Sequence, residues 1–329
     1  MLRVVVAVLL LALGVCSFGY YQLQQTINTP LRIEQSQLVE VATGTGFNKL
    51  CQQWQAKNWL SECWRFQLMA KLDPSLTDIK AGLYQIQPGT VLSAFRKIAL
   101  GQQHEFSFTI IEGDNLRQVL ARLAEAQFVT EPLKWGDSFL GKPLNEQFEG
   151  KLFPDTYHYH ANETAQQILK RAYNKMEQEL ALAWQQRAQS SPLQTPYEAL
   201  ILASIIEKET GAAGERPLIA SVFVNRLNKG MRLQTDPTVI YGIGPDFDGN
   251  ITRRHLREVT PYNTYRIDGL PPTPIAMPSR KALMATVQPA QSDYYYFVAK
   301  GDGSHQFSKR LEEHNQAVRQ YQLKSRNGS

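Results

Sequence analysis

The sequence predicts an α+β protein with an N-terminal transmembrane helix, a small α/β module and a larger α+β domain. An uncharged apolar run opens the chain, short strand and helix patterns alternate after it, and long helical patterns fill the second half. With 329 residues, 43% apolar and 20% charged, the composition is that of a globular protein rather than a disordered or collagen-like chain. The length suits two folded domains together with an anchor or tail.

The N-terminus is predicted to be a membrane anchor. After Arg3 the chain reads VVVAVLLLALGVCSFGYY, an uncharged run of about the length that crosses a bilayer as a helix. Arg3 on the short leading side favours a cytoplasmic N-terminus and an exported body. A cleaved signal peptide is the alternative, because Ser17 and Gly19 form a small-residue pair, but the run is longer than a typical signal core. We therefore assign 1–3 to the cytoplasm, 4–21 to the transmembrane helix and 22–37 to a polar periplasmic stalk.

The predicted small module covers residues 38–103. A strand and a Gly-Thr-Gly turn open it at LVEVATGTGFNKL, and two helices follow around Cys51 and Cys63. AGLYQIQPGT supplies a second strand and a Pro-Gly turn, and VLSAFRKIALG is a helix that ends at Gly101. In an exported protein the two cysteines could be oxidised. The sequence leaves open whether they form a disulfide or remain buried thiols.

A connecting region, 104–163, leads to the larger domain, 164–329. It begins with a strand, a turn and a helix that Asn115 is expected to cap. Loops rich in Trp, Gly and Pro then lead to FEGKLFPDTYHYHANET. The larger domain opens with a long helix, and two more helices follow in TPYEALILASIIEKE and ERPLIASVFVNRLNKG. A strand at YYYFVAK and a final helix complete the prediction.

Two acids stand near the end of the helix predicted to begin at Thr195. At about 100° per residue, Glu209 falls in the middle of the apolar stripe of this helix, and Glu207 falls on the other side. Apolar surroundings disfavour the charged form of a carboxyl, so Glu209 could hold a proton near neutral pH as a general acid must. The alternative is that the helix frays after Ile206 and both acids are solvated. The helical pattern alone does not decide between them.

Several segments together resemble the endolytic murein transglycosylases, also called the YceG-like family. These are LILASIIEKETG, ERPLIASVFVNRLNKGMRLQTDPTVIYG, YNTYRIDGLPPTPIAMPS, YYYFVAKGDGSHQFS and EGKLFPDTY, together with the apolar N-terminus. The resemblance covers nearly the whole chain. It implies that Glu209, the second glutamate of the Glu-Lys-Glu-Thr motif that ends at Thr210, is the catalytic acid. It also implies a LysM-like fold for the small module and a catalytic role for the larger domain.

The resemblance implies lytic cleavage of nascent peptidoglycan at the MurNAc-β-1,4-GlcNAc bond, which leaves 1,6-anhydro-MurNAc ends and limits glycan strand length. The muramyl C6 hydroxyl attacks in place of water, so a second carboxylate to activate water is not required. We expect a single-pass inner-membrane protein with its catalytic body in the periplasm. Its partners would be glycan strands, the inner membrane and glycan-polymerising synthases. The alternatives are a peptidoglycan-binding scaffold without catalysis and a hydrolase that makes reducing ends.

Six further residues are predicted to bind substrate, because their amides, hydroxyls and carboxyls can bond to sugars: Glu149, Gln234, Asp236, Tyr241, Asn263 and Tyr265. Asp236 could instead cap a helix, and Asn263 could instead form an Asx-turn. We expect no metal or other cofactor, since no histidine, cysteine or glycine pattern of such a site is found. Lys and Arg are spread along the chain, so nucleic acid is not an expected partner.

Overall fold

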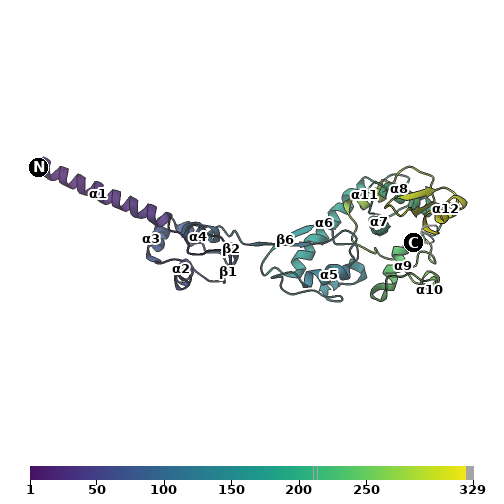
Figure 1. Ribbon diagram of the computed structural model, residues 1–329, viewed down its shortest axis with the longest axis horizontal. Helices are drawn as coiled ribbons and strands as arrows, with labels where there is room; N and C mark the ends of the chain where they lie inside the picture. Colours follow the sequence, from purple (N-terminus) through teal and green to yellow (C-terminus); the bar gives the residue numbers. More distant parts are fainter. Residues whose placement is uncertain (210, 213, 324–329) are drawn as a thin grey trace. The chain divides into compact units, whose positions relative to one another are not determined.

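The computed structural model describes residues 1–209, 211–212 and 214–323. Two compact units make up the chain (Figure 1). Unit 1 comprises Met1–Phe106 and His158–Asn162, and unit 2 comprises Ser107–Tyr157 and Glu163–Ser329. Helices and strands are mixed, and an apolar helix stands at the N-terminus, so this much of the predicted fold class is confirmed.

Helix α1 (Leu2–Ile27) is long and apolar enough to cross a membrane, although a signal sequence would pass the same test. Its apolar part is exposed. The helix continues past the apolar run into the segment 22–37, where Thr26 is buried and Leu23 packs against the core of unit 1. Leu31 is buried as well. Much of the segment for which we predicted a stalk is therefore folded onto unit 1.

The rest of unit 1 has the predicted order of strand, two helices, strand and helix. Its elements are β1 (Gln37–Val41), α2 (Phe47–Ala56), α3 (Trp64–Leu72), η1 (Pro74–Thr77), β2 (Gly82–Ile86) and α4 (Val91–Ala99). Strands β1 and β2 are antiparallel, with Val39 opposite Tyr84. Thr90 caps α4, because its side chain accepts a hydrogen bond from the backbone N–H of Ser93.

An aromatic cluster forms the core of unit 1. The rings of Trp54 on α2 and Phe95 on α4 are stacked with centroids 4.7 Å apart, and both side chains are almost fully buried. Cys51 and Cys63 form a disulfide that links α2 to the residue preceding α3. This answers the question that the sequence left open about the two cysteines.

Unit 2 contains most of the helices. Its elements, with β3 and β6 reaching into unit 1, are β3 (Glu105–Thr109), α5 (Leu116–Ala124), β4 (Ser138–Phe139), β5 (Lys142–Pro143), η2 (Glu146–Phe148), β6 (Thr156–His160), α6 (Ala165–Gln185), α7 (Pro196–Glu209), α8 (Arg216–Asn228), α9 (Asp236–Ile243), η3 (Gly244–Asp246), α10 (Arg253–Arg257), α11 (Arg280–Val287), β7 (Tyr296–Ala299), β8 (His305–Ser308), α12 (Leu311–Val318) and η4 (Arg319–Leu323). The strands pair as β3 with β6, β4 with β5, and β7 with β8.

Helix α7 lies at the centre of unit 2. Every residue from 199 to 206 is buried, and helices α6, α8, α9 and α11 pack against α7. The one polar side chain in that stretch, Ser204, donates to the carbonyl of Ile201 (2.7 Å) and accepts from the N–H of Ile275 (3.0 Å). The helix is thus enclosed on all sides, and its last residue is Glu209.

Candidate active site

Helix α7 carries Glu209 as its last residue. The helix starts as predicted, since the hydroxyl of Thr195 accepts a hydrogen bond from the N–H of Glu198 (3.2 Å). The alternative in which the helix frays after Ile206 is wrong, because regular helix continues to Glu209. Thr210, which ends the Glu-Lys-Glu-Thr motif, lies outside the described residues.

The carboxyl of Glu209 is set up to hold a proton near neutral pH. Burial is the main cause that raises its pKa, to about 7, and the negative charge of Asp236 adds to the rise. A hydrogen bond from the hydroxyl of Thr235 and the positive charges of His305 and Arg226 act in the opposite direction. The rise prevails, so this carboxyl can act as an acid and, after giving up its proton, as a base.

The loop before α9 holds Thr235 against Glu209 through a network of threonines. The N–H of Thr235 donates to the hydroxyl of Thr264 (3.0 Å), and the hydroxyls of Thr238 and Thr264 are 2.8 Å apart. Gln234 is exposed and has a φ of 51°, which is uncommon for a residue other than glycine. Its N–H donates to the carbonyl of Thr264 (3.1 Å), so the surrounding loop supports this conformation.

Asp236 and Tyr265 form a second pair next to Glu209. The hydroxyl of Tyr265 donates to a carboxylate oxygen of Asp236 (2.7 Å). Asp236 is the first residue of α9, and the residue before it, Thr235, makes no side-chain capping bond. Burial and the nearby carboxylates of Asp236 and Glu209 raise the pKa of Tyr265. The side chain of Asp236 therefore contacts Tyr265 in this cluster of acids.

Asn263 is buried behind that pair and is 1% exposed. Its side-chain amide donates to the carbonyls of His255 (3.0 Å) and Glu258 (2.6 Å), and its oxygen accepts from the N–H of Tyr265 (3.0 Å). The last bond is that of an Asx-turn, the alternative that the sequence left open. In this structure the amide shapes the loop that presents Tyr265.

The carboxylate of Glu207 is buried and contacts Arg216 and Ser279. Its carboxylate lies 2.9 Å from the guanidinium of Arg216 on α8 and accepts from the N–H (2.8 Å) and hydroxyl of Ser279. Its side chain is 5% exposed. The sequence predicted Glu207 on the side of α7 away from the apolar stripe, but that side is also buried because α8 and α11 pack on it. A buried charge needs this kind of partner.

His305 and Glu215 were not predicted, although His305 acts on Glu209 and Glu215 bonds to His305. The ring Nδ1 of His305 lies 2.6 Å from a carboxylate oxygen of Glu215, and the backbone N–H of His305 donates to the other oxygen (3.0 Å). These bonds join the start of β8 to the residue preceding α8. Glu215 and His305 are far apart in the sequence, and no local pattern would have paired them.

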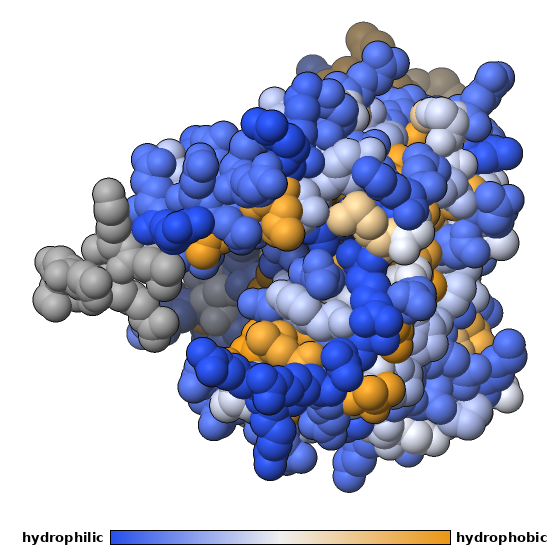
Figure 2. Space-filling model, turned by 90° about the vertical axis from the view of Figure 1, so that its right-hand side faces the viewer, coloured by the Kyte–Doolittle hydropathy of each residue, from blue (hydrophilic) through white to orange (hydrophobic). Residues whose placement is uncertain are grey.

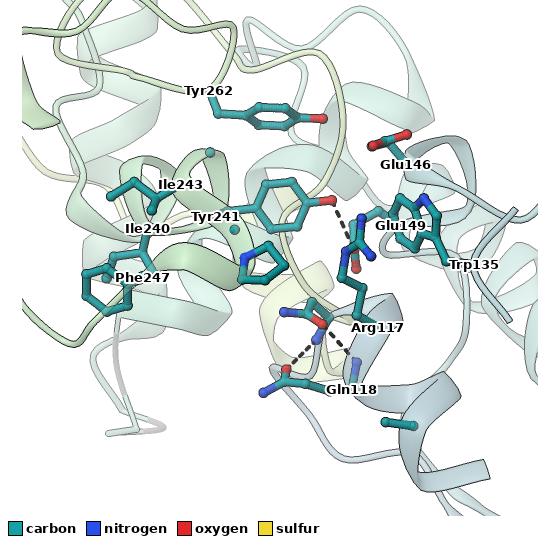
Figure 3. Close-up of a pocket in the computed structure, with 15 residues that line it drawn as sticks. Arg117, Gln118, Trp135, Glu146, Glu149, Ile240, Tyr241, Ile243, Phe247 and Tyr262 are labelled. Carbon is teal, nitrogen blue, oxygen red and sulfur yellow. Dashed lines mark hydrogen bonds between the residues drawn. The ribbon is translucent and has the colours of Figure 1, made fainter. Parts of the chain in front are cut away.

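A pocket of about 620 Å³ lies beside α9, and Glu149 and Tyr241 belong to it (Figure 3). Glu149 is 1% exposed and accepts bonds from the N–H of Leu116 (3.0 Å) and the hydroxyl of Tyr241 (3.0 Å). Burial raises the pKa of Glu149 to about 7, although these hydrogen bonds and the charge of Arg117 favour the carboxylate. Glu149 thus connects the first turn of α5 to α9.

Aromatic rings form much of the wall of this pocket. The rings of Tyr241 and Tyr262 meet edge to face with centroids 4.9 Å apart. The guanidinium of Arg117 lies 3.8 Å from the centre of the Trp135 ring. On the face drawn in Figure 2, hydrophilic side chains predominate, apolar ones form small separate spots, and the surface is hollowed on one side.

Helix α9 connects the two parts of the candidate site. Asp236, at its start, belongs to the group around Glu209, and Tyr241 lines the pocket. At 1.5 Å per residue, these two positions are about 7.5 Å apart along the helix axis. The structure therefore gathers Gln234, Asp236 and Tyr265 near Glu209 and places Glu149 with Tyr241 in the pocket. The described residues contain no cluster of histidines, cysteines or acids that could hold a metal ion.

Comparison with known proteins points to one family. Residues 39–320 match the model of the YceG-like family. An endolytic murein transglycosylase of Bacillus subtilis (strain 168) is 33% identical over 264 residues, which cover 74% of this chain and 73% of that protein. One of Streptococcus pneumoniae (strain ATCC BAA-255 / R6) is 28% identical over 284 residues, and there this chain spans only 51% of the relative's length.

A solved structure is also similar. The crystal structure of a YceG-like protein from Listeria monocytogenes shares 29% identity and superimposes with a TM-score of 0.53. The match covers 86% of this chain and 99% of that one. The family match extends over most of the chain, including all the residues of the candidate site, so this protein belongs to the YceG-like family.

Proposed function

We propose that this protein is a lytic transglycosylase that cuts nascent peptidoglycan internally, at the bond between N-acetylmuramic acid and N-acetylglucosamine. The observation that carries the proposal is the position of Glu209, which ends the buried helix α7 and accepts a hydrogen bond from Thr235. Burial there raises its pKa to about 7. The relatives named endolytic murein transglycosylases support the reaction class. In this proposal the glycan strand lies across the group around Glu209 and the pocket beside α9.

In the proposed reaction Glu209 acts twice. Its carboxyl gives a proton to the glycosidic oxygen, and the bond from that oxygen to the muramyl anomeric carbon breaks. The carboxylate then takes the proton of the muramyl C6 hydroxyl, whose oxygen bonds to the anomeric carbon. The products are a new N-acetylglucosamine hydroxyl and a 1,6-anhydro-muramyl end, and Glu209 is again protonated. Because the attacking hydroxyl belongs to the same sugar, it is already positioned for the reaction.

The remaining site residues would bind the strand. Gln234 is exposed next to Thr235, and its amide can bond to a sugar hydroxyl or acetamido group. Asp236 and Tyr265 present a hydrogen-bonded pair to the same region. Tyr241, hydrogen-bonded to Glu149, offers an aromatic face and a hydroxyl to a further sugar. We propose that Asn263 acts by shaping the loop of Tyr265.

The proposal extends to the location of the enzyme. Helix α1 would be a retained inner-membrane anchor, with the catalytic region 164–329 in the periplasm and cleavage close to the membrane, which limits strand length. The β-α-α-β order and the antiparallel strands of unit 1 support a LysM-like module that holds glycan. Glycan-polymerising synthases would supply the nascent strands.

Replacing Glu209 with Gln tests the reaction. Gln has nearly the same shape but no acidic proton, so we expect the rate on nascent glycan to fall at least about 100-fold. Mass spectrometry of the products should show anhydro-muramyl ends with the unaltered protein. The matched control is Glu312→Gln, which changes an exposed acid of α12. Binding of glycan to the Glu209→Gln protein should persist.

Two outcomes would contradict the proposal. Products heavier by one water, with reducing ends, would indicate a hydrolase. Glycan binding without any cleavage by the unaltered protein would indicate a scaffold.

A further inference from the structure

Helix α3 of unit 1 has an apolar face that is largely exposed in the described part of the chain. Trp64, Leu68 and Leu72 are 57%, 53% and 70% exposed, respectively. They are four residues apart and therefore lie on one face of the helix. Phe66 and Met69 on the other side are buried in the core of unit 1. The helix is thus apolar on both sides. Its outer face, formed by Trp64, Leu68 and Leu72, stays largely exposed, although Arg65 lies over the ring of Trp64.

This outer face borders the N-terminal helix. A groove of about 390 Å³ between α1 and α3 is lined by both helices, and Figure 1 shows α3 beside the end of α1. The three residues of the outer face line the groove on the α3 side, and Phe18 and Gly19 line it on the α1 side. Those two residues belong to the uncharged run of α1 that we expect to lie in the membrane.

The groove therefore fixes the height of α3 relative to a bilayer that α1 would span. Tyr20 and Tyr21 end the uncharged run, where interfacial aromatic residues are common. Phe18 is about 4.5 Å further along the helix toward the membrane interior than Tyr21. Since α3 shares a groove with Phe18, its outer face reaches the level at which lipid headgroups meet acyl chains.

We infer that α3 rests on the membrane surface as an interfacial helix, with Trp64, Leu68 and Leu72 inserted among the lipids. The inference requires α1 to be a retained anchor. Amphipathic helices at interfaces bury their apolar face about 5–10 Å into this boundary. Lys71, which is exposed next to Leu72, can approach anionic headgroups.

The consequence is that unit 1 is attached to the bilayer at two places. Leu23 and Thr26 of α1 pack into unit 1, so the anchor continues into the folded unit. With α3 also in contact with lipid, unit 1 would be held against the membrane instead of turning freely about a single helix.

Spin labels on the full-length chain in lipid nanodiscs test this inference. A label is placed at Leu68→Cys or, as the matched control, at Leu38→Cys, both in a Cys16→Ser background so that the label has a single site. Leu38 is also an exposed leucine of unit 1 (47%), but it lies on β1 and outside the groove. Collision rates with oxygen, which concentrates in lipid, are compared with those of a water-soluble nickel complex.

We expect the label at position 68 to collide more with oxygen and less with the nickel complex than the label at position 38. Brominated lipids should quench Trp64, and the quenching should decrease in Trp64→Phe. Equal, water-like exposure at both positions would overturn the inference. Shielding of position 68 from both reagents would also overturn it, because protein would then cover the face. These results do not depend on glycan cleavage, so they can fail while the proposed reaction stands.

Discussion

At the scale of single residues, two glutamates of one helix differ because of what surrounds them. Glu207 is neutralised by Arg216 and accepts two bonds from Ser279. Glu209 has no ion-pair partner within the described residues, and burial raises its pKa to about 7. A buried carboxyl without an oppositely charged partner is harder to ionise, so it keeps its proton to higher pH. We therefore propose the acid role for Glu209 and a structural role for Glu207.

The hydroxyl of Thr235 should control the pH range of activity. An acid is active when protonated, so kcat/KM should fall as pH rises through about 7, the pKa of Glu209. The hydrogen bond from Thr235 favours the carboxylate. In Thr235→Val this effect is lost, the pKa of Glu209 rises, and the decline in kcat/KM should move to higher pH. A pH–rate profile measures the shift, and Thr235→Ser should restore the original profile. An unchanged profile in Thr235→Val would contradict this role.

At the scale of elements, buried polar contacts fasten the helices around α7. The Glu207–Arg216 ion pair joins the end of α7 to the start of α8, and the bonds from Ser279 join α7 to the residue preceding α11. Gly113 lies at the same place, where its carbonyl accepts from Lys208 (3.1 Å) and its N–H donates to Met277 (2.9 Å). These contacts hold the helix end that presents Glu209.

Breaking that ion pair should destabilise unit 2. Both side chains are nearly inaccessible, with 5% and 8% exposure, so Glu207→Gln leaves Arg216 charged and unpaired at a cost of about 3 kcal/mol. Chemical unfolding measures the loss. Glu207→Gln/Arg216→Met should recover part of it, because the unpaired charge is removed. A cost below about 0.5 kcal/mol, as expected for an exposed acid, would mean that the pair contributes little.

The disulfide of unit 1 should stabilise that unit specifically. Cys51 and Cys63 are 12 residues apart in the sequence, and closing a loop of this size contributes about 3 kcal/mol. Cys51→Ala/Cys63→Ala should lower the free energy of unfolding of unit 1 by that amount, as followed by the fluorescence of the buried Trp54. The control, Cys16→Ser on the exposed part of α1, should change nothing. Equal stability of the two variants would contradict the prediction.

At the scale of the whole molecule, we propose that the N-terminal helix sets where the enzyme works. Helix α1 continues without a break from the apolar run into the core of unit 1. Removal of the run would leave the remaining residues of this helix, among them the buried Thr26, at a new chain end. This continuity supports our proposal that the run is retained as an anchor.

The retained anchor makes a clear prediction for the mature chain. Protein extracted from membranes should still contain the uncharged run that follows Arg3. Alkaline carbonate should not release it, because a spanning helix holds it in the lipid. Intact-mass spectrometry and N-terminal sequencing are the measurements. A mature chain that begins just after Gly19, found in the soluble fraction, would show that the run is a signal peptide.

The sequence by itself determined the features that depend on neighbouring residues. The uncharged run predicted α1, the alternation of strand and helix patterns predicted the order of elements in unit 1, and Thr195 marked the start of α7. The helical pattern also extended to Glu209, which is the last residue of α7. Such signals can be read from the sequence because they repeat within one or two turns of the chain.

Only the tertiary structure decided which side chains meet. Glu209 accepts from Thr235, 26 residues away, and Tyr241 donates to Glu149, 92 residues away. The burial of Glu207 depends on α8 and α11, which periodicity within α7 cannot reveal. A pKa depends on burial and on nearby charges in three dimensions. The sequence could therefore indicate the candidate acid, whereas the packing of distant segments supplies its partners and forms the pocket beside α9.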